Sequence, residues 1–282
     1  MLPIAVAPTV SELRRIVSGW RAAQNRIALV PTMGALHEGH LALVRLARAR
    51  ADRVVASIFV NPTQFAPNED FSKYPRTFED DCAKLAGVAD AVFAPSVEEM
   101  YPPGAATMIV PAGPATVGLE DRFRPTHFQG VATVVAKLLI QSAPDIAVFG
   151  EKDFQQLKVV SRMTTDLSMP VEIVPAPIIR EPDGLAMSSR NRYLSPDERR
   201  TAPALFRALT QAADRIRAGR DFNPVLDEAR TALTDAGFVL DYVEARHAET
   251  LAPLESAFGA APLRLLAAAR LGKTRLIDNL AI

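Results

Sequence analysis

The spacing of apolar residues along the chain predicts strands and helices that alternate. Short apolar runs at 26–30 and 54–60 predict two strands, the first ending before Pro31. The second run is almost wholly apolar, as in a strand buried on both faces. Apolar residues recur at helical intervals over 38–50, and an earlier helix is expected from the capping-box pattern at Thr9 to about Ala23. Strand, helix and strand within about 35 residues form a parallel βαβ unit.

The same alternation continues to about residue 174. Three more helix and strand pairs are expected, with helices at 78–85, 130–141 and 154–166 and strands at 91–93, 146–149 and 171–174. Repeated alternation of this kind predicts an α/β fold, a Rossmann-like doubly wound parallel sheet with helices on both faces.

The pattern changes after the turn-rich segment 181–184. One long helix is expected from Ser195 to just before Gly219, and another from Asn223 to Gly237. Strands are expected at 239–246 and 263–269, with a hairpin-like tail after Gly272. We therefore expect two domains, a nucleotide-binding domain at 1–184 and a smaller C-terminal α+β lid domain at 185–282.

Composition narrows the classes of protein. Of 282 residues, 49% are hydrophobic and 23% charged, so the chain can bury a core and is not disordered. Lys plus Arg and Asp plus Glu both number 32, which argues against bulk nucleic-acid binding but permits a local basic pocket. Cys82 is the single cysteine, so neither an intramolecular disulfide nor a cysteine-based zinc site is expected. With no signal-peptide pattern and no apolar run near 18 residues, we expect a cytoplasmic protein without a membrane span.

The first strand-to-helix junction, Met33 to His40, is the leading candidate for an anion site. Ligands of open α/β sheets bind beyond the carboxyl ends of the strands, and free N–H groups at a helix N-terminus attract anions. His37 and His40 are three residues apart, so both imidazoles can face one phosphate. A structural histidine pair or a metal-binding pair is the alternative.

Three other segments follow predicted strands or lie near the domain junction. Asn61 and Gln64 supply neutral amides, although Asn61-Pro62 is also a turn signal. Gly150 to Asp153 brings Lys152 to a strand end, with Asp153 able to take a ribose hydroxyl or to cap the helix. Met187 to Arg190 suits a polyphosphate, with an ordinary polar loop as the alternative.

Four long stretches in this order resemble one family. They are Pro-Thr-Met-Gly-Ala-Leu-His-Glu-Gly-His, Ile-Phe-Val-Asn-Pro-Thr-Gln-Phe, Phe-Gly-Glu-Lys-Asp-Phe-Gln-Gln-Leu and Gly-Leu-Ala-Met-Ser-Ser-Arg-Asn-Arg-Tyr-Leu. The sequence is similar over most of its length to the pantoate–β-alanine ligase family of the nucleotidyltransferase superfamily. The resemblance implies that ATP and Mg²⁺ drive the joining of pantoate to β-alanine through a pantoyl adenylate, with release of AMP and pyrophosphate. It also implies a homodimer.

The resemblance further implies roles for individual residues. His40 would be the proton donor with His37 beside it, Lys152, Ser188, Ser189 and Arg190 would act on the phosphates, and Gln64, Gln156 and Asn61 would form the site for pantoate and β-alanine. Asp80 and Asp81 offer an outer contact to Mg²⁺, with a solvated helix N-terminus as the simpler alternative. The full ATP site would comprise Met33, Gly34, Ala35, Leu36, His37, Glu38, Gly39, His40, Gly150, Glu151, Lys152, Asp153, Ile179, Met187, Ser188, Ser189 and Arg190.

Three other functions compete with this one. A nucleotidyltransferase that adenylylates a phosphate would need no site for a second, amine substrate, so the pair Gln64 and Gln156 speaks against it. A tRNA-charging synthetase would need a longer chain with a basic surface. A non-catalytic nucleotide-binding regulator on the same fold would not need His40, Lys152 and Arg190 together.

Overall fold

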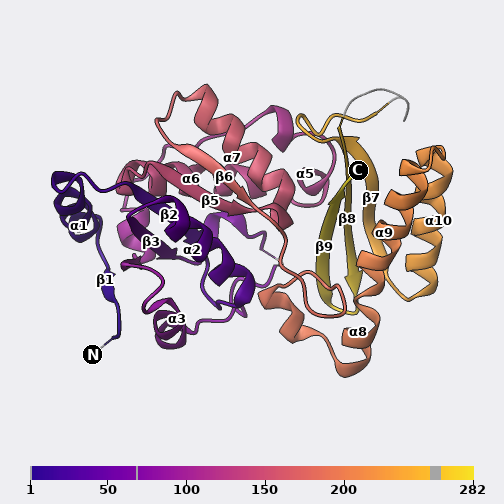
Figure 1. Cartoon of the computed structure of the whole chain (residues 1–282), viewed down its shortest axis with the longest axis horizontal. Coiled ribbons are helices and arrows are strands. Elements are labelled where there is room, and N and C mark those ends of the chain that lie inside the picture. Colours follow the sequence, from indigo (N-terminus) through magenta and orange to yellow (C-terminus); the bar gives the residue numbers. More distant parts are fainter. Residues whose placement is uncertain (1, 68, 255–261) are drawn as a thin grey trace.

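A computed structural model describes residues 2–67, 69–254 and 262–282 of the chain (Figure 1). Six parallel strands form the larger sheet, in the spatial order β1-β4-β3-β2-β5-β6. Along the chain these are β1 (Ala5–Ala7), β2 (Ile27–Thr32), β3 (Arg53–Ile58), β4 (Ala91–Phe93), β5 (Ile146–Gly150) and β6 (Glu172–Ala176).

Helices cover both faces of this sheet, which confirms the doubly wound α/β fold. On one face α2 (Glu38–Arg50) and α3 (Phe78–Leu85) pack against the strands, and on the other lie α1 (Val10–Ala22), α6 (His127–Ser142) and α7 (Phe154–Asp166). The short elements are η1 (Pro62–Gln64), α4 (Val97–Met100), η2 (Gly113–Ala115), α5 (Glu120–Phe123) and η3 (Glu151–Asp153).

The direction of winding reverses at β2. Strands β3 and β4 extend from one side of β2, whereas β5 and β6 lie on its other side. The carboxyl ends of β2 and β5 therefore flank the switch point, where open α/β sheets bind their ligands.

A second, antiparallel sheet of three strands follows, in the order β7-β8-β9. Its strands are β7 (Val239–His247), β8 (Leu263–Leu271) and β9 (Thr274–Ala281), and the turn η4 (Ser189–Tyr193) and helices α8 (Pro196–Thr201), α9 (Ala204–Arg217) and α10 (Phe222–Asp235) precede them. Helices α9 and α10 cover one face of this sheet (Figure 1). The opposite face contributes Tyr242, Leu266 and Ala268 to the core of the larger sheet. The smaller domain is thus docked through an apolar sheet face, and the boundary at 184/185 stays a prediction.

Two expectations about element ends were wrong because of prolines. Strand β2 runs through Pro31 to Thr32, but its pairing with β5 ends at Leu29, so the missing N–H of Pro31 costs no hydrogen bond on that side. The single helix expected after Ser195 is two helices, because Pro203 lies inside it and cannot donate to the preceding turn.

Other differences concern short or neighbouring elements. Helix α6 begins at His127 rather than near Gly130, and β3 ends at Ile58 rather than Val60. The three-residue strand β1 was not predicted, since three residues carry too little pattern. No helix in the described ranges is both long and apolar enough to cross a membrane.

Candidate functional site

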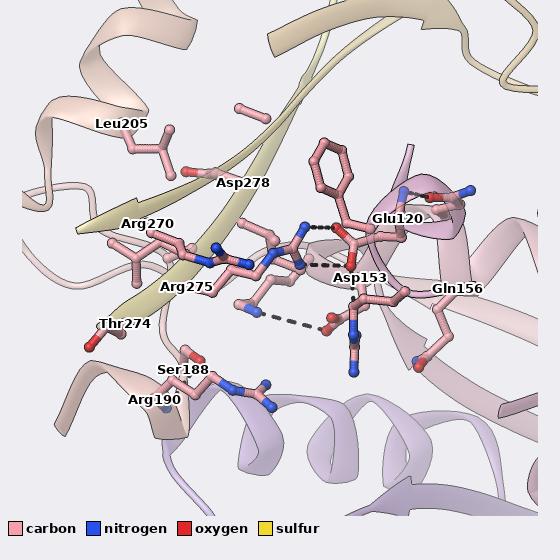
Figure 2. Close-up of a pocket in the computed structure, with 18 of the residues that line it drawn as sticks. Glu120, Asp153, Gln156, Ser188, Arg190, Leu205, Arg270, Thr274, Arg275 and Asp278 are labelled. Atoms are coloured by element: carbon pink, nitrogen blue, oxygen red, sulfur yellow. Dashed lines mark hydrogen bonds and ion pairs between the residues drawn. The ribbon is translucent and has the colours of Figure 1, made fainter. Parts of the chain in front are cut away.

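Two adjoining cavities open at the carboxyl ends of β2 and β5. The inner one has a volume of about 220 Å³, and the outer one, about 690 Å³, lies between the two domains (Figure 2). Lys152 and Arg190 line both. The inner cavity collects residues from all four candidate segments, namely Met33, His37, Gly39, His40, Asn61, Gln64, Gly150, Lys152, Asp153, Gln156, Ile179, Met187, Ser188, Ser189 and Arg190.

Five residues of the expected ATP site do not line the inner cavity. Ala35 and Leu36 are buried in the protein, and Gly34 has a φ of +78° with Asp81 directly beside it. Glu38 pairs with Arg45 at the surface. The fifth, Glu151, pairs with Arg264 of the smaller domain.

Asp81 holds the loop that follows β2. Its side chain is fully buried, and its two oxygens accept the backbone N–H groups of Leu36 at 2.7 Å and Ala35 at 2.8 Å. The Thr77 hydroxyl donates to the same carboxylate at 3.1 Å. Both oxygens of Asp81 are thus used inside the protein, so the solvated reading is wrong for Asp81, whereas Asp80 is exposed in the first turn of α3 as that reading predicts.

The N–H groups of this loop are also largely used within the protein. Besides the two on Asp81, the N–H of His37 donates to Nδ1 of His40 at 3.3 Å, and that of Gly39 donates to Nδ1 of His37 at 3.1 Å. The expectation that free N–H groups make the anion site is thus corrected. The Nε2 edges of His37 and His40 remain available to a ligand in the inner cavity.

The two histidines present neutral N–H donors. Because both Nδ1 atoms accept hydrogen bonds, the ring proton of each lies on Nε2. The ring centroids are 4.0 Å apart. Burial, with Lys152 and Arg192 nearby, lowers the pKa of His37 to about 4. Burial, with His37 and Lys152 nearby, lowers the pKa of His40 to about 3. Both rings are neutral at pH 7, so each offers a hydrogen bond from Nε2–H.

Asn61 and Gln64 form a fixed amide pair at the end of β3. Asn61 is buried, and its Nδ2 donates to Oε1 of Gln64 at 3.1 Å and to the carbonyl of Gly130 at 3.2 Å. A Cβ on Gly130 would lie 2.4 Å from the carbonyl oxygen of Thr63, so only glycine lets η1 approach α6 this closely. Asn61 also caps η1, so the turn signal was correct and the same residue orients Gln64.

Lys152 lies on η3, the turn that joins β5 to α7. Its Nζ is 3.9 Å from Asp153. Asp153 occupies the N-cap position of α7 but makes no side-chain cap hydrogen bond, so the capping alternative was wrong. Lys152 and Asp153 line both cavities. The ammonium group suits a phosphate, and the Asp153 carboxylate, which makes no capping hydrogen bond, suits a ribose hydroxyl.

The loop 187–190 is held by the side chains of Asp70 and Tyr74. Arg190 donates from Nε and Nη2 to the two oxygens of Asp70 at 3.0 and 2.9 Å. The hydroxyl of Tyr74 is 3.0 Å from that of Ser189. Asp70 and Tyr74 carry no motif, so no sequence signal identified these partners.

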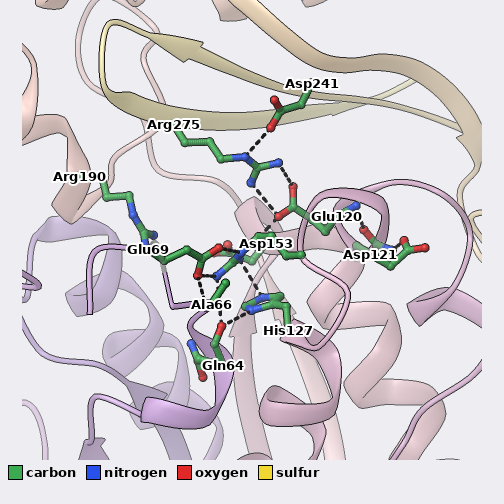
Figure 3. Close-up of polar contacts among 12 residues, drawn as sticks. Gln64, Ala66, Glu69, Glu120, Asp121, His127, Asp153, Arg190, Asp241 and Arg275 are labelled. Carbon is green, nitrogen blue, oxygen red and sulfur yellow. Dashed lines mark hydrogen bonds and ion pairs between the residues drawn. The ribbon is translucent and has the colours of Figure 1, made fainter. Parts of the chain in front are cut away.

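A polar network connects the smaller domain to Gln64 (Figure 3). Arg275 donates to both oxygens of Glu120 at 2.7 and 2.8 Å, and Arg124 lies 3.6 Å from the same carboxylate. Although burial opposes it, hydrogen bonding to Arg275 lowers the pKa of Glu120 to about 2.

The network continues from Arg124 into the cavity wall. Arg124 also donates to Glu69 and to Nε2 of His127, whose Nδ1–H donates to the carbonyl of Gln64 at 3.0 Å. Sequence reasoning gave Arg124 and His127 no role, although their spacing of three residues repeats that of His37 and His40.

Metal ligands are few at this site. Within the described ranges, no group of three or more His, Cys, Asp or Glu side chains is arranged to hold a metal ion. Asp70 is paired with Arg190 and Asp81 with backbone N–H groups.

Comparison with known proteins places the chain among ligases. The family model for pantoate-beta-alanine ligase matches residues 5–281. The chain is 59% identical over 279 residues to a pantothenate synthetase of Nitrobacter hamburgensis, covering 99% of this chain and 98% of the relative. It is 58% identical over 281 residues to one of Rhodopseudomonas palustris, covering 99% of each chain.

Solved structures agree. A pantothenate synthetase from Thermus thermophilus superposes with a TM-score of 0.91 at 49% identity, covering 98% of this chain and 99% of that one. A pantoate-beta-alanine ligase from Francisella tularensis, described as complexed with beta-gamma ATP and β-alanine, superposes with a TM-score of 0.81 at 33% identity. That match covers 99% of this chain and 97% of the other.

Proposed function

The chain belongs to the pantoate–β-alanine ligase family, and we propose that its reaction takes place in the inner cavity, between β2, β5 and residues 187–190. The enzyme uses ATP to condense pantoate with β-alanine, through a pantoyl adenylate, and releases AMP and pyrophosphate. The convergence of His37, His40 and Lys152 at the switch point of the sheet is the observation that carries this assignment of the site.

The first step is attack of the pantoate carboxylate on the α-phosphorus of ATP. Negative charge grows on the phosphoryl oxygens and on the departing pyrophosphate. Donors fixed in advance around such charge stabilise the transition state. Here these are the Nε2–H groups of His37 and His40 and the cation of Lys152. Arg190 joins them once it exchanges Asp70 for phosphate.

Pantoate occupies the side of the cavity beside Gln64. Its hydroxyl and carboxylate groups meet Gln64 and Gln156, and Asn61 keeps Gln64 in place through the 3.1 Å hydrogen bond. The lining of the cavity also includes the apolar side chains of Val131, Val134, Val135, Leu138 and Phe59. These side chains suit the branched methyl carbons of pantoate.

The second step needs no nucleophile from the protein. The free amine of β-alanine attacks the carbonyl of the pantoyl adenylate, and AMP leaves. Gln64 lies at the point where the amine enters, and the smaller domain excludes water that would hydrolyse the adenylate.

The base is held near Ile179. The carbonyl of Ile179 accepts the N–H of Met187 at 3.0 Å. We therefore assign adenine to the N–H of Ile179, so that the base and the loop 187–190 share one backbone link.

Mg²⁺, when present, would be held by phosphate oxygens of ATP and by water, because the described residues offer no group of three or more His, Cys, Asp or Glu side chains arranged for a metal ion. When bound, Mg²⁺ neutralises phosphate charge.

The test is AMP release from ATP and Mg²⁺ with pantoate, β-alanine, both or neither. We expect rapid AMP release only with both, and exchange of pyrophosphate into ATP that depends on pantoate alone. Pyrophosphate release that needs neither substrate would reject the ligase reaction. Pantoate-independent exchange would reject the adenylate.

We also propose that the enzyme works in the cytoplasm as a homodimer. The larger domain exposes large apolar side chains on α6 and at residues 108 and 110. Met108 is 59% exposed, Val110 75% and Ile140 62%. Light scattering coupled to gel filtration should give twice the chain mass, and a monomer would reject this proposal.

A further inference from the structure

Side chains of the smaller domain form hydrogen bonds to the backbone of the turn that carries Lys152. The side-chain amide of Asn279, on β9, donates to the backbone carbonyl of Glu151 at 2.9 Å and to that of Lys152 at 3.0 Å. These two carbonyls are consecutive, so one NH₂ group spans the turn. Asn279 is 2% exposed, so water does not compete for either bond.

Arg264 fixes the orientation of that amide. Its Nε donates to Oδ1 of Asn279 at 2.7 Å, which leaves the NH₂ group directed at the turn. Its Nη2 donates to Glu151 at 3.0 Å, and its guanidinium lies 3.9 Å above the ring of Phe154. The residues on both sides of Lys152 and Asp153 are therefore held by Arg264.

The adjoining residue of β9 holds the other end of the nucleotide site. Asp278 pairs with both terminal nitrogens of Arg180, at 2.6 and 2.9 Å. Arg180 directly follows Ile179. One strand of the smaller domain thus contacts the backbone segments that we assign to phosphate and to base.

The position of this turn depends on these contacts because the turn has few local hydrogen bonds that would fix it. It is a single 3-10 turn of three residues, and neither it nor α7 begins with a side-chain cap hydrogen bond. A shift of its backbone moves the ammonium group of Lys152 relative to His37 and His40. Misplacement of a catalytic group by about 1 Å can cost up to about 100-fold in rate.

We propose that Asn279 is a positioning residue for Lys152: the smaller domain, through this amide, sets the backbone of the phosphate-binding turn. The inference rests on the proposed contact of Lys152 with the phosphates. It makes the first chemical step depend on an amide that does not line the inner cavity.

A double-mutant cycle tests it, with pantoate-dependent exchange of pyrophosphate into ATP as the readout. We expect Asn279→Ala to lower kcat for exchange by at least about 10-fold while the KM for pantoate stays within about 2-fold. In the Lys152→Ala background the same substitution should change kcat by less than about 2-fold, because its effect acts through Lys152. Equal fold losses in both backgrounds would overturn the proposal.

Ile277→Ala is the matched control. Ile277 lies two residues away on β9 and packs against the core of the larger sheet without a hydrogen bond to the turn. We expect its kcat to stay within about 2-fold of the parent. A loss equal to that of Asn279→Ala would assign the effect to general docking and overturn the proposal.

Two further outcomes separate this inference from the proposed site. A near-normal exchange rate in Lys152→Ala alone would reject the role of Lys152 and, with it, the inference. An impaired Lys152→Ala with additive losses would reject only the inference. If Asn279→Ala does not fold, as judged by circular dichroism, Asn279→Ser keeps one donor and enters the same cycle.

Discussion

Asp81 and Leu36 are joined by a 2.7 Å hydrogen bond from the backbone N–H of Leu36 to a carboxylate that is completely buried. The other oxygen of Asp81 accepts the N–H of Ala35 at 2.8 Å. A carboxylate is the one side chain that offers two acceptor oxygens to two consecutive N–H groups. The loop before His37 therefore depends on a residue 45 positions away along the chain.

Asp81→Asn should loosen this loop. The amide keeps the volume but presents a donor to one of the two N–H groups, which leaves a buried group unsatisfied. We expect a loss of about 2 to 3 kcal/mol in the free energy of unfolding, measured in urea, and a higher KM for ATP. Asp80→Asn is the control, since Asp80 is exposed and paired with Lys84, and should change stability by less than about 0.5 kcal/mol. Equal effects of the two substitutions would contradict the anchoring role.

Two substitutions can separate the roles of the two ring nitrogens of His40. His40→Asn places an acceptor near Nδ1, which keeps the bond from His37, and loses the Nε2–H donor. His40→Gln places an amide donor near Nε2. We expect His40→Asn to lower the rate of adenylate formation by about 100-fold or more, and His40→Gln to lose less. A near-normal rate in His40→Asn would remove His40 from the mechanism.

Gln64→Ala should separate the two substrates. The side chain lies beside Met33 and Asn61 on the pantoate side of the cavity. We expect the KM for pantoate to rise by at least about 10-fold, as for a lost polar anchor, with the KM for ATP within about 2-fold. Equal increases in both constants would reject the placement of pantoate.

Asp70→Asn tests whether the Arg190 ion pair competes with phosphate. Arg190 gives two hydrogen bonds to Asp70, which must be exchanged if the guanidinium is to meet ATP. Removing the carboxylate charge should lower the KM for ATP, by about 3- to 10-fold. A raised KM would show that Asp70 orients Arg190 for binding instead.

Stability should fall on mild acidification. The pKa values of His37 and His127 are lowered by burial to about 4, and that of His40 to about 3. In the unfolded chain these rings take up protons near pH 6.5. Below that pH the unfolded state binds more protons, so the free energy of unfolding decreases as pH falls toward 4.

Between pH 7 and pH 5, histidines of the unfolded chain titrate while most carboxylates stay ionised, so this range reports on the histidines. Urea unfolding across this range should show uptake of protons that approaches about three per molecule near pH 5. His37→Gln should reduce this uptake by about one proton. A free energy that is flat between pH 7 and 5 would show that the rings are charged in the folded state.

The sequence by itself predicted the helices α2, α3 and α7 and strand β4 at their observed ends, because apolar spacing and caps are local properties. The prediction failed at β1, where three residues give only a weak signal, and at Pro203, which divides one helical pattern into two helices. Three of the four candidate segments were found from residue type and from their position after a strand, and the fourth, 187–190, from residue type near the domain junction. In a parallel sheet such positions meet at one edge.

Packing between distant parts of the chain decides which groups of those segments already have partners within the protein. The N–H groups of Ala35 and Leu36 are taken by Asp81, and the guanidinium of Arg190 is taken by Asp70. Such partners are distant along the chain and carry no motif, so their pairing depends on packing. Local patterns and motifs were enough to identify the family, the parallel sheet and the chemistry of the side chains. Long-range contacts, which also bring Asn279 to Lys152, set which donors are free and which are already paired.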